Sequence, residues 1–139
     1  MNPERMKQRG INFAKREWAV LKGWRLVFNK IAYRNPKEGY ANIVKDEKGT
    51  VEGVLYDVLE EDIKKLDRYE CYPIHYNKIT VKVNLKNGKE IDAITYIAQP
   101  DKIKDGLKPD REYLNHLLKG NDLLSEKYCE RLKTWENLY

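Results

Sequence analysis

Residues 51–70 read VEGVLYDVLEEDIKKLDRYE and place two periodicities side by side. The first eight residues, 51–58, mix β-branched and aromatic side chains and predict a strand. In residues 59–70, three acidic residues follow Leu59, where a helix dipole favours negative charge, and apolar residues then repeat at helical spacing. The segment therefore predicts a strand followed at once by a short helix with one buried stripe. The stripe consists of Ile63, Leu66 and Tyr69.

The residues upstream of this unit also predict extended structure. Residues 18–33, WAVLKGWRLVFNKIAY, are rich in β-branched and aromatic residues around Gly23 and predict one or two strands. Residues 39–44 predict a further strand. We expect a turn at residues 46–49, before the strand at 51–58, because Asp46 and Gly49 are typical turn residues.

A β-hairpin is predicted downstream. Residues 78–86, KITVKVNLK, alternate strictly between apolar and polar side chains, and residues 90–98, EIDAITYIA, form a second strand pattern. Asn87-Gly88 lies between them and is typical of a type I′ turn, in which both central residues have positive φ. The apolar face of the first strand consists of Ile79, Val81, Val83 and Leu85.

The last third of the chain predicts two helices. Asp110 can cap the first helix, which Gly120 can end at its C′ position. Ser125 can cap the second. The fold class is therefore α+β, with about five or six largely antiparallel strands, a short internal helix and helices near the C-terminus. The helical stripes are Tyr113, Leu114, Leu117 and Leu118 in the first, and Tyr128, Leu132 and Trp135 in the second.

Length and composition indicate one soluble globular domain over residues 1–139. Hydrophobic residues make up 41% and charged residues 35%, a balance that argues against disorder. We see no signal peptide and no apolar run near the roughly 20 residues that a membrane span needs. Cys71 and Cys129 have no paired spacing and are expected to be reduced thiols. We therefore expect a cytoplasmic protein without a membrane partner.

Positive charge is concentrated in residues 1–40, which contain ten Lys or Arg residues and three acidic ones. Aromatic residues are interleaved with them, as on some nucleic-acid-binding surfaces. The alternative is that the aromatic residues face a core from strands whose basic neighbours face water. Because the chain contains no known nucleic-acid-binding motif, we prefer this alternative and expect no nucleic-acid partner.

Several kinds of catalytic site are not indicated. His75 and His116 are far apart and have no cysteine or carboxylate at ligand spacing, so we expect no metal. His116 fits a surface position on its helix. The glycines form no P-loop or dinucleotide pattern, and no nucleophile elbow is present. We therefore expect no cofactor.

Glu70 is the candidate for acid–base chemistry. It ends the short helix, where the dipole disfavours a negative charge, and precedes Cys71-Tyr72-Pro73. A carboxylate among aromatic rings would have its pKa raised by desolvation, as a base working near neutral pH requires. From the residues alone, a solvated glutamate without a role is the preferred interpretation, because most glutamates are exposed. The nearby tyrosines are Tyr69, Tyr72, Tyr76, Tyr96 and Tyr113.

The order of these segments resembles the γ-glutamylcyclotransferase family along nearly all of the chain. The most specific part is the V-x-G-V-x-Y strand at residues 51–56, followed by L-D-x-x-E at residues 66–70. The other matching segments are Gly39 to Ile43, Tyr76 entering a strand, Thr95-Tyr96, Pro109 to Tyr113, and the helix from Tyr128 to Leu132.

The resemblance implies a fold and a reaction. The fold would be a small mixed β-barrel, largely antiparallel, with helices packed around it and a cavity at one mouth. The reaction would cyclise the γ-glutamyl group of a small molecule to 5-oxoproline and release an amine or amino acid. Glu70 falls on the family's catalytic acid/base, and Tyr113 and Tyr76 match aromatic residues that border the substrate. Such a reaction needs no metal and no enzyme nucleophile.

One departure from the family pattern concerns the first residues. Family members carry a Tyr-Gly-Ser-Asn loop after their first strand, and its backbone N–H groups face the substrate carbonyl. Residues 1–6, MNPERM, resemble the residues immediately after that loop. We expect a start assigned too late rather than a shortened protein, because a missing barrel strand exposes an edge. The alternative is a catalytically inactive member that keeps the cavity as a small-molecule binding module. The oligomeric state is left open.

Overall fold

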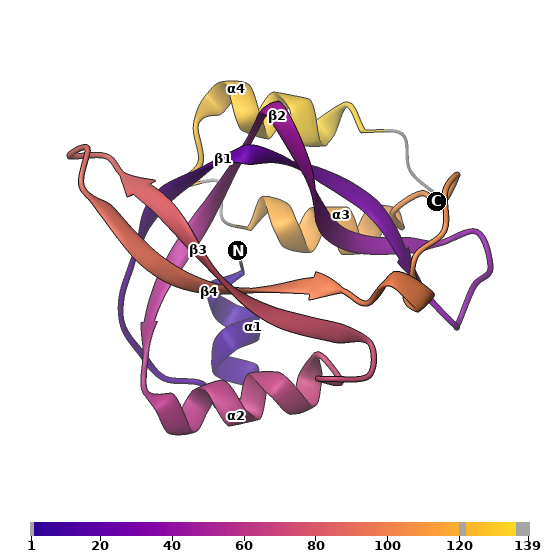
Figure 1. The fold of residues 1–139 in the computed structure, drawn as a ribbon, viewed down its shortest axis with the longest axis horizontal. Helices are drawn as coiled ribbons and strands as arrows, with labels where there is room; N and C mark the ends of the chain where they lie inside the picture. The colour runs from indigo at the N-terminus through magenta and orange to yellow at the C-terminus, as the bar shows by residue number, and fades with distance from the viewer. Residues whose placement is uncertain (1, 120–121, 136–139) are drawn as a thin grey trace.

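The computed structural model of the protein describes residues 2–119 and 122–135 and confirms the α+β class. In Figure 1, α2 and α4 lie at opposite ends of the molecule, with α1 and α3 between them. The elements are α1 (Pro3–Gln8), β1 (Phe13–Ile31), β2 (Gly39–Val58), α2 (Glu60–Tyr69), β3 (Tyr76–Leu85), β4 (Glu90–Ala98), the 3₁₀ turn η1 (Pro100–Lys102), α3 (Arg111–Leu118) and α4 (Glu126–Lys133).

The strands form one antiparallel sheet in the order β2-β1-β3-β4, which curves without closing. β1 and β3 share only the pairs Ala19–Leu85 and Val20–Asn84. No ladder joins β2 to β4 within the part of the chain that the structure describes. The expected barrel is therefore an open one in the described residues, and the expected number of strands is wrong. Four long strands replace five or six shorter ones.

The turn expected at residues 46–49 is also wrong, because β2 runs through it. The pairing with β1 jumps from Lys22–Thr50 to Trp24–Lys45, so four residues of β2 stand opposite one residue of β1. The side chain of Asp46 accepts a hydrogen bond from the Lys48 N–H at 3.1 Å. The turn-forming residues thus make a bulge and do not reverse the chain.

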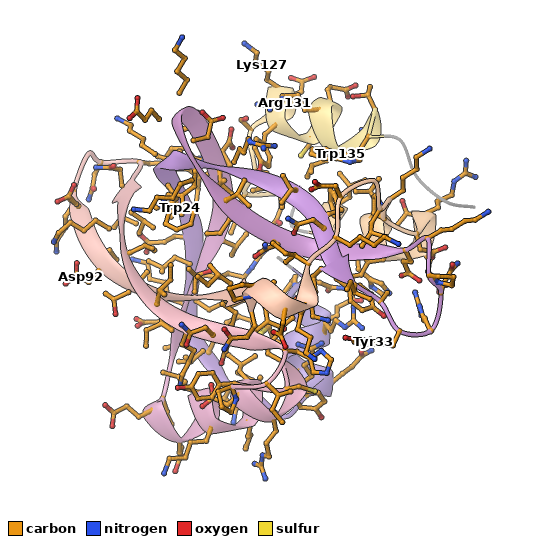
Figure 2. All side chains as sticks on the ribbon, turned by 45° about the vertical axis from the view of Figure 1, so that its right-hand side comes forward. Trp24, Tyr33, Asp92, Lys127, Arg131 and Trp135 are labelled. Atoms are coloured by element: carbon orange, nitrogen blue, oxygen red, sulfur yellow. The ribbon has the colours of Figure 1, made fainter. Side chains whose placement is uncertain are left out.

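The hairpin of β3 and β4 is confirmed, with a different turn. The Leu85 N–H donates to the Lys89 oxygen, and the Gly88 N–H donates to the Leu85 oxygen, both at 2.9 Å. Gly88 has a φ of 82°, whereas Asn87 keeps a negative φ. This is a three-residue loop with a left-handed glycine, and not a type I′ turn. On the outer face Asp92, which points away from the sheet in Figure 2, pairs with Lys82 at 3.1 Å.

Both predicted helix caps near the C-terminus are confirmed. The Asp110 carboxylate accepts from the Glu112 N–H at 3.1 Å, and the Ser125 hydroxyl accepts from the Tyr128 N–H at 3.2 Å. Gly120, the expected end of the first helix, lies outside the described residues. Trp135, labelled beyond α4 in Figure 2, packs edge-on against Phe28 of β1 with 4.8 Å between ring centroids.

Two apolar clusters hold these elements together. One joins α4 to the sheet and α3 and is built on Leu124, Tyr128, Cys129 and Leu132. The other lies between the two hairpins of the sheet and is built on Ala19, Leu21 and Val83. The Glu52 carboxylate adds a polar link, because it accepts from the Trp18 indole N–H at 2.8 Å and from the Ser125 hydroxyl at 2.6 Å.

The helix α2 is confirmed, but its stripe is partly wrong. Tyr69 is 53% exposed, and the buried residue of the helix is Asp62, whose carboxylate accepts from the Asn12 N–H at 3.3 Å. Ile63 and Leu66 are half-buried, as the spacing predicted. Tyr69 is the last residue of the helix.

The end of α2 is fixed by a Schellman motif. The Tyr72 N–H donates to the Asp67 oxygen at 2.8 Å, and the Cys71 N–H donates to the Arg68 oxygen at 3.2 Å. Cys71 occupies the left-handed position with a φ of 53°, which costs about 1 kcal/mol for a residue with a Cβ. This turn holds Glu70 at the C-cap, where its side chain is half-buried.

One edge of β2 faces away from β1. The backbone groups of Ala41 on this edge make hydrogen bonds with side chains and not with a neighbouring strand. The Ala41 N–H donates to the Tyr113 hydroxyl at 3.0 Å, and the Tyr76 hydroxyl donates to the Ala41 oxygen at 3.2 Å. Next to it, the Asn42 side-chain oxygen accepts from the Ala98 N–H at 2.8 Å. These bonds join β2 to β3, β4 and α3 where a closed barrel would have a ladder.

Removing the two hydroxyls should therefore cost stability unequally. Tyr113→Phe leaves the Ala41 N–H without its acceptor and should lower the free energy of unfolding by about 1–3 kcal/mol. Tyr76→Phe should cost less, because a carbonyl oxygen tolerates a missing partner better than an N–H does. Urea denaturation of both variants gives the comparison. Equal stability of Tyr113→Phe and the wild type would contradict this account.

Gly39 begins β2 at a close approach of two backbones. A Cβ at this position would overlap the backbone oxygen of Phe28 and lie 2.8 Å from the Leu107 Cβ. The Gly39 N–H also donates to the Lys108 oxygen at 2.8 Å. Gly53, further along the same strand, has no atom within 4 Å of an added Cβ. The two glycines therefore form a matched pair.

We predict that Gly39→Ala lowers the free energy of unfolding by about 2 kcal/mol, since the strands must separate to admit the methyl group. Gly53→Ala should change it by less than about 1 kcal/mol. Thermal unfolding followed by circular dichroism measures both. Similar effects at the two positions would show that the close approach at Gly39 carries no strain.

Candidate active site

A cavity of about 480 Å³ opens where α1, α3, the end of β1 and the end of α2 meet. The three residues predicted from the sequence to form the site, Glu70, Tyr76 and Tyr113, all line it. They come from α2, β3 and α3, so the fold brings together positions up to 43 residues apart in the sequence. The charged residues of the lining are Arg5, Arg9, Lys30, Arg34, Glu70 and Glu112.

Glu70 is the carboxylate best suited to move a proton. Its side chain is 28% exposed, and one oxygen lies 3.6 Å from a guanidinium nitrogen of Arg9. Burial raises the pKa of Glu70, and the positive charges of Arg9 and Arg5 offset part of this effect. The result is a carboxylate that gains and loses a proton closer to neutral pH than an exposed glutamate does.

Two tyrosines of the cavity, Tyr113 and Tyr76, have pKa values raised by burial, that of Tyr113 to about 12. The ring of Tyr40 lies 5.1 Å from that of Tyr113. Of the other tyrosines near Glu70 in the sequence, Tyr69 lines the cavity. Tyr96 instead donates to Asp67 at 2.6 Å.

The contribution of α1 to the cavity was not predicted from the sequence. Arg5 and Arg9 are one helical turn apart and both reach the cavity. The signal was available, because Asn2-Pro3 is a typical cap and first residue of a helix. The Asn2 side chain accepts from the N–H groups of Glu4 and Arg5 at 3.0 and 3.4 Å.

His116 is not the surface residue that was expected. It is half-buried, lines the cavity, and its Nδ1 lies 3.2 Å from the side-chain nitrogen of Asn2. The amphipathic pattern of the helix had favoured a solvent-facing position for it, but Asn2, the N-cap of α1, contacts its ring. The contact with Asn2 therefore links α1 to α3.

Lys30 was missed as well. It alternates with Phe28 and Ala32, and the structure buries all three. A lysine at an inward position of an apolar strand pattern was the available signal. The residue is 3% exposed, and its side chain belongs to the cavity lining.

Metal-ligand clusters and membrane-spanning helices are both absent from the described residues. Among residues 2–119 and 122–135, no group of three or more His, Cys, Asp or Glu side chains is arranged to hold a metal ion. None of the helices in these ranges has the length and apolar character to cross a membrane.

The family model for gamma-glutamyl cyclotransferase, AIG2-like, matches residues 1–115. No curated protein matches the sequence. Among solved structures, the human protein described as uncharacterized protein loc79017 superposes with a TM-score of 0.84 at 24% identity, over 99% of this chain and 83% of that one. A structure named gamma-glutamyl cyclotransferase gives 0.84 at 23% identity, again over 99% and 83%.

YkqA from Bacillus subtilis gives a TM-score of 0.83 at 24% identity, over 99% of this chain and 52% of YkqA. At these identities the structural likeness establishes the fold. The family model adds membership, because it matches well over half of the sequence and includes Glu70, Tyr76 and Tyr113. The chain belongs to the AIG2-like gamma-glutamyl cyclotransferase family.

Proposed function

We propose that this protein cyclises the γ-glutamyl group of a small molecule to 5-oxoproline and releases an amine or amino acid. Glu70 is the general acid/base, and Tyr76 and Tyr113 border the substrate. The observation that carries the proposal is a carboxylate with a raised pKa in the wall of the cavity. Membership of the family supports the reaction type.

The reaction starts at the α-ammonium of the glutamyl group. Glu70 accepts one proton from it, and the freed nitrogen attacks the γ-carbonyl carbon to form the ring C–N bond. In the tetrahedral intermediate the ring nitrogen still carries two protons. Glu70 passes its proton to the leaving nitrogen, and the bond between that nitrogen and the γ-carbon breaks. Glu70 then accepts the second proton from the ring nitrogen and passes it to the released amine, which leaves a neutral lactam, an ammonium product and the Glu70 carboxylate. Because both reacting groups belong to one molecule, the protein has mainly to hold the substrate in a folded conformation.

The environment of Glu70 suits both halves of this cycle. A fully solvated glutamate would be too weak a base to deprotonate an ammonium group at a useful rate. Burial raises the pKa of Glu70, and the charge of Arg9 at 3.6 Å offsets part of that rise. A pKa closer to neutrality favours both acceptance and donation of the proton.

Tyr76 and Tyr113 are suited to shaping the cavity. Their hydroxyls are held by the backbone of Ala41, and the pKa of each is raised by burial. They are therefore poor candidates for proton transfer near neutral pH. Their rings can limit the conformations of the glutamyl chain to those in which nitrogen and carbonyl meet.

The proposal extends to the setting of the reaction. We propose a cytoplasmic single-domain enzyme that uses no cofactor and has no nucleic-acid partner. Cys71 and Cys129 are unpaired thiols in the structure, which fits a reducing compartment. A protein that only binds its ligand is the competing function, and turnover measurements separate the two.

Glu70→Gln should abolish 5-oxoproline release from γ-glutamyl dipeptides and γ-glutamylamines, with a loss of at least about 100-fold. Glutamine keeps the size of the side chain and cannot accept the proton. Glu112→Gln removes the other carboxylate of the cavity and should retain most of the activity. Chromatographic detection of 5-oxoproline measures all three proteins. Turnover by Glu70→Gln close to that of the wild type would refute the assigned role, and a well-folded wild type inactive on every substrate would favour the binding module.

The same variant gives a pH-dependent prediction for stability. Because the folded state holds a proton on Glu70 more tightly than the unfolded chain does, ionisation of Glu70 destabilises the fold as pH rises through the raised pKa. Glutamine cannot ionise. Glu70→Gln should therefore be more stable than the wild type at about pH 8, with the difference shrinking towards about pH 4.

Chemical denaturation across this pH range measures the effect. Glu61→Gln, at an exposed position of the same helix, is the matched control and should not show the same trend. A difference between Glu70→Gln and the wild type that stays constant with pH would mean that the fold does not shift the pKa of Glu70.

A further inference from the structure

Lys30 is a buried cation without a carboxylate partner among the residues that the structure describes. The residue is 3% exposed, and its ammonium donates one hydrogen bond, to the Ile31 oxygen at 2.7 Å. Within residues 2–119 and 122–135, no carboxylate lies at ion-pair distance from it. A lysine ammonium has three donors, and burial of a charge is costly unless those donors are used.

Three tyrosine rings surround the ammonium. Its nitrogen lies 5.6 Å from the ring centroids of Tyr33 and Tyr76, and 5.9 Å from that of Tyr40. These rings belong to the loop after β1, to β3 and to β2. Such contacts favour a positive charge, but they supply no hydrogen-bond acceptor. The cage therefore holds the ammonium in place and leaves donors available to the cavity.

Two other cations of the cavity already have carboxylate partners. Arg9 lies 3.6 Å from Glu70, and both ends of the Arg34 guanidinium bond the buried Glu38 at 2.8 and 2.7 Å. Burial lowers the pKa of Lys30, the nearby Cys71 and Glu70 oppose this effect, and the charge of Lys102 adds to it. An anion bound beside Lys30 would raise the pKa of its ammonium again. A negatively charged ligand would therefore stabilise the charged form of Lys30.

We propose that the Lys30 ammonium binds the α-carboxylate of the γ-glutamyl group. This inference rests on the proposed function and names the residue that recognises the substrate. The α-carbon of a glutamyl group carries an ammonium and a carboxylate, so its recognition requires an acceptor of opposite charge for each. Glu70 and Lys30 line the same cavity and provide that pair.

The pairing has a consequence for specificity. A 4-aminobutyryl amide has the same nitrogen and the same carbonyl but lacks the carboxylate, and its cyclisation would give 2-pyrrolidinone. If the Lys30 ammonium binds the carboxylate, the amine of this compound can still exchange a proton with Glu70, but the compound makes no ion pair with Lys30. The corresponding product pair, 5-oxoproline and 2-pyrrolidinone, differs in the same single group.

The experiment measures the binding of 5-oxoproline and 2-pyrrolidinone by calorimetry to the wild type and to Lys30→Met. Methionine fills similar space and removes a buried charge, so the fold should survive, which thermal unfolding checks. Lys102→Met is the matched control, because Lys102 also lies over the Tyr33 ring, at 5.9 Å, and pairs with Asp101. Arg5→Met tests another cation of the cavity.

We expect Lys30→Met to weaken 5-oxoproline binding about tenfold to a hundredfold and to leave 2-pyrrolidinone binding within about threefold. Lys102→Met should bind both ligands as the wild type does. Equal losses for both ligands in Lys30→Met would overturn the inference, as would an unchanged affinity for 5-oxoproline. A loss confined to Arg5→Met, or a wild type that does not bind 5-oxoproline, would overturn it too.

Turnover distinguishes this inference from the proposed function. The ratio of rates for a γ-glutamyl amide and the matching 4-aminobutyryl amide should fall at least about tenfold in Lys30→Met. An active enzyme whose ratio does not change would keep the proposed function and refute the role of Lys30. A protein inactive on every substrate that still shows the selective binding loss would keep the Lys30 site and refute the proposed function.

Discussion

The site depends on the hydrogen bonds that the backbone N–H and C=O of Ala41 must make. Among the described residues no strand pairs with the edge of β2 that faces away from β1, and the N–H and C=O of the half-buried Ala41 must find other partners. The hydroxyls of Tyr113 and Tyr76 meet this need at 3.0 and 3.2 Å. Because each hydroxyl is held at its far end, each ring is fixed between β2 and the cavity. A requirement of the backbone thus sets the shape of the binding site.

The cavity gains its charge pattern from the same arrangement. Tyr76 contributes to the cage around Lys30, so the residue that satisfies Ala41 also orders the buried cation. Glu70 is placed independently, by the turn at Cys71 that ends α2. Two opposite charges therefore enter one cavity from different elements, each held by its own local structure. Neither depends on the other for its position, which leaves both able to contact a ligand.

Local signals in the sequence were sufficient for much of this fold. The caps at Asp110 and Ser125 and the alternation around Val83 depend on neighbouring residues, and the structure confirms them. The turn expected at residues 46–49 failed because pairing with β1 outweighs turn propensity, so the extra residues bulge. Closure of the sheet could not be judged locally, since it depends on contacts between distant strands. Glu70 was found from its odd place at a helix end, together with the family resemblance.

Lys30 shows why part of the site was hidden. In the sequence it is one basic residue among many in the first 40, and its alternation with Phe28 is outweighed by the usual preference of lysine for solvent. Only the fold shows that the inward face of β1 continues through position 30, into a space walled by tyrosines. Burying an ammonium there costs stability, and the cage and the bond to Ile31 offset only part of that cost. Packing alone does not explain a buried ammonium that lowers the stability of the fold. An anionic ligand would supply the hydrogen-bond acceptors that the protein itself does not provide to Lys30.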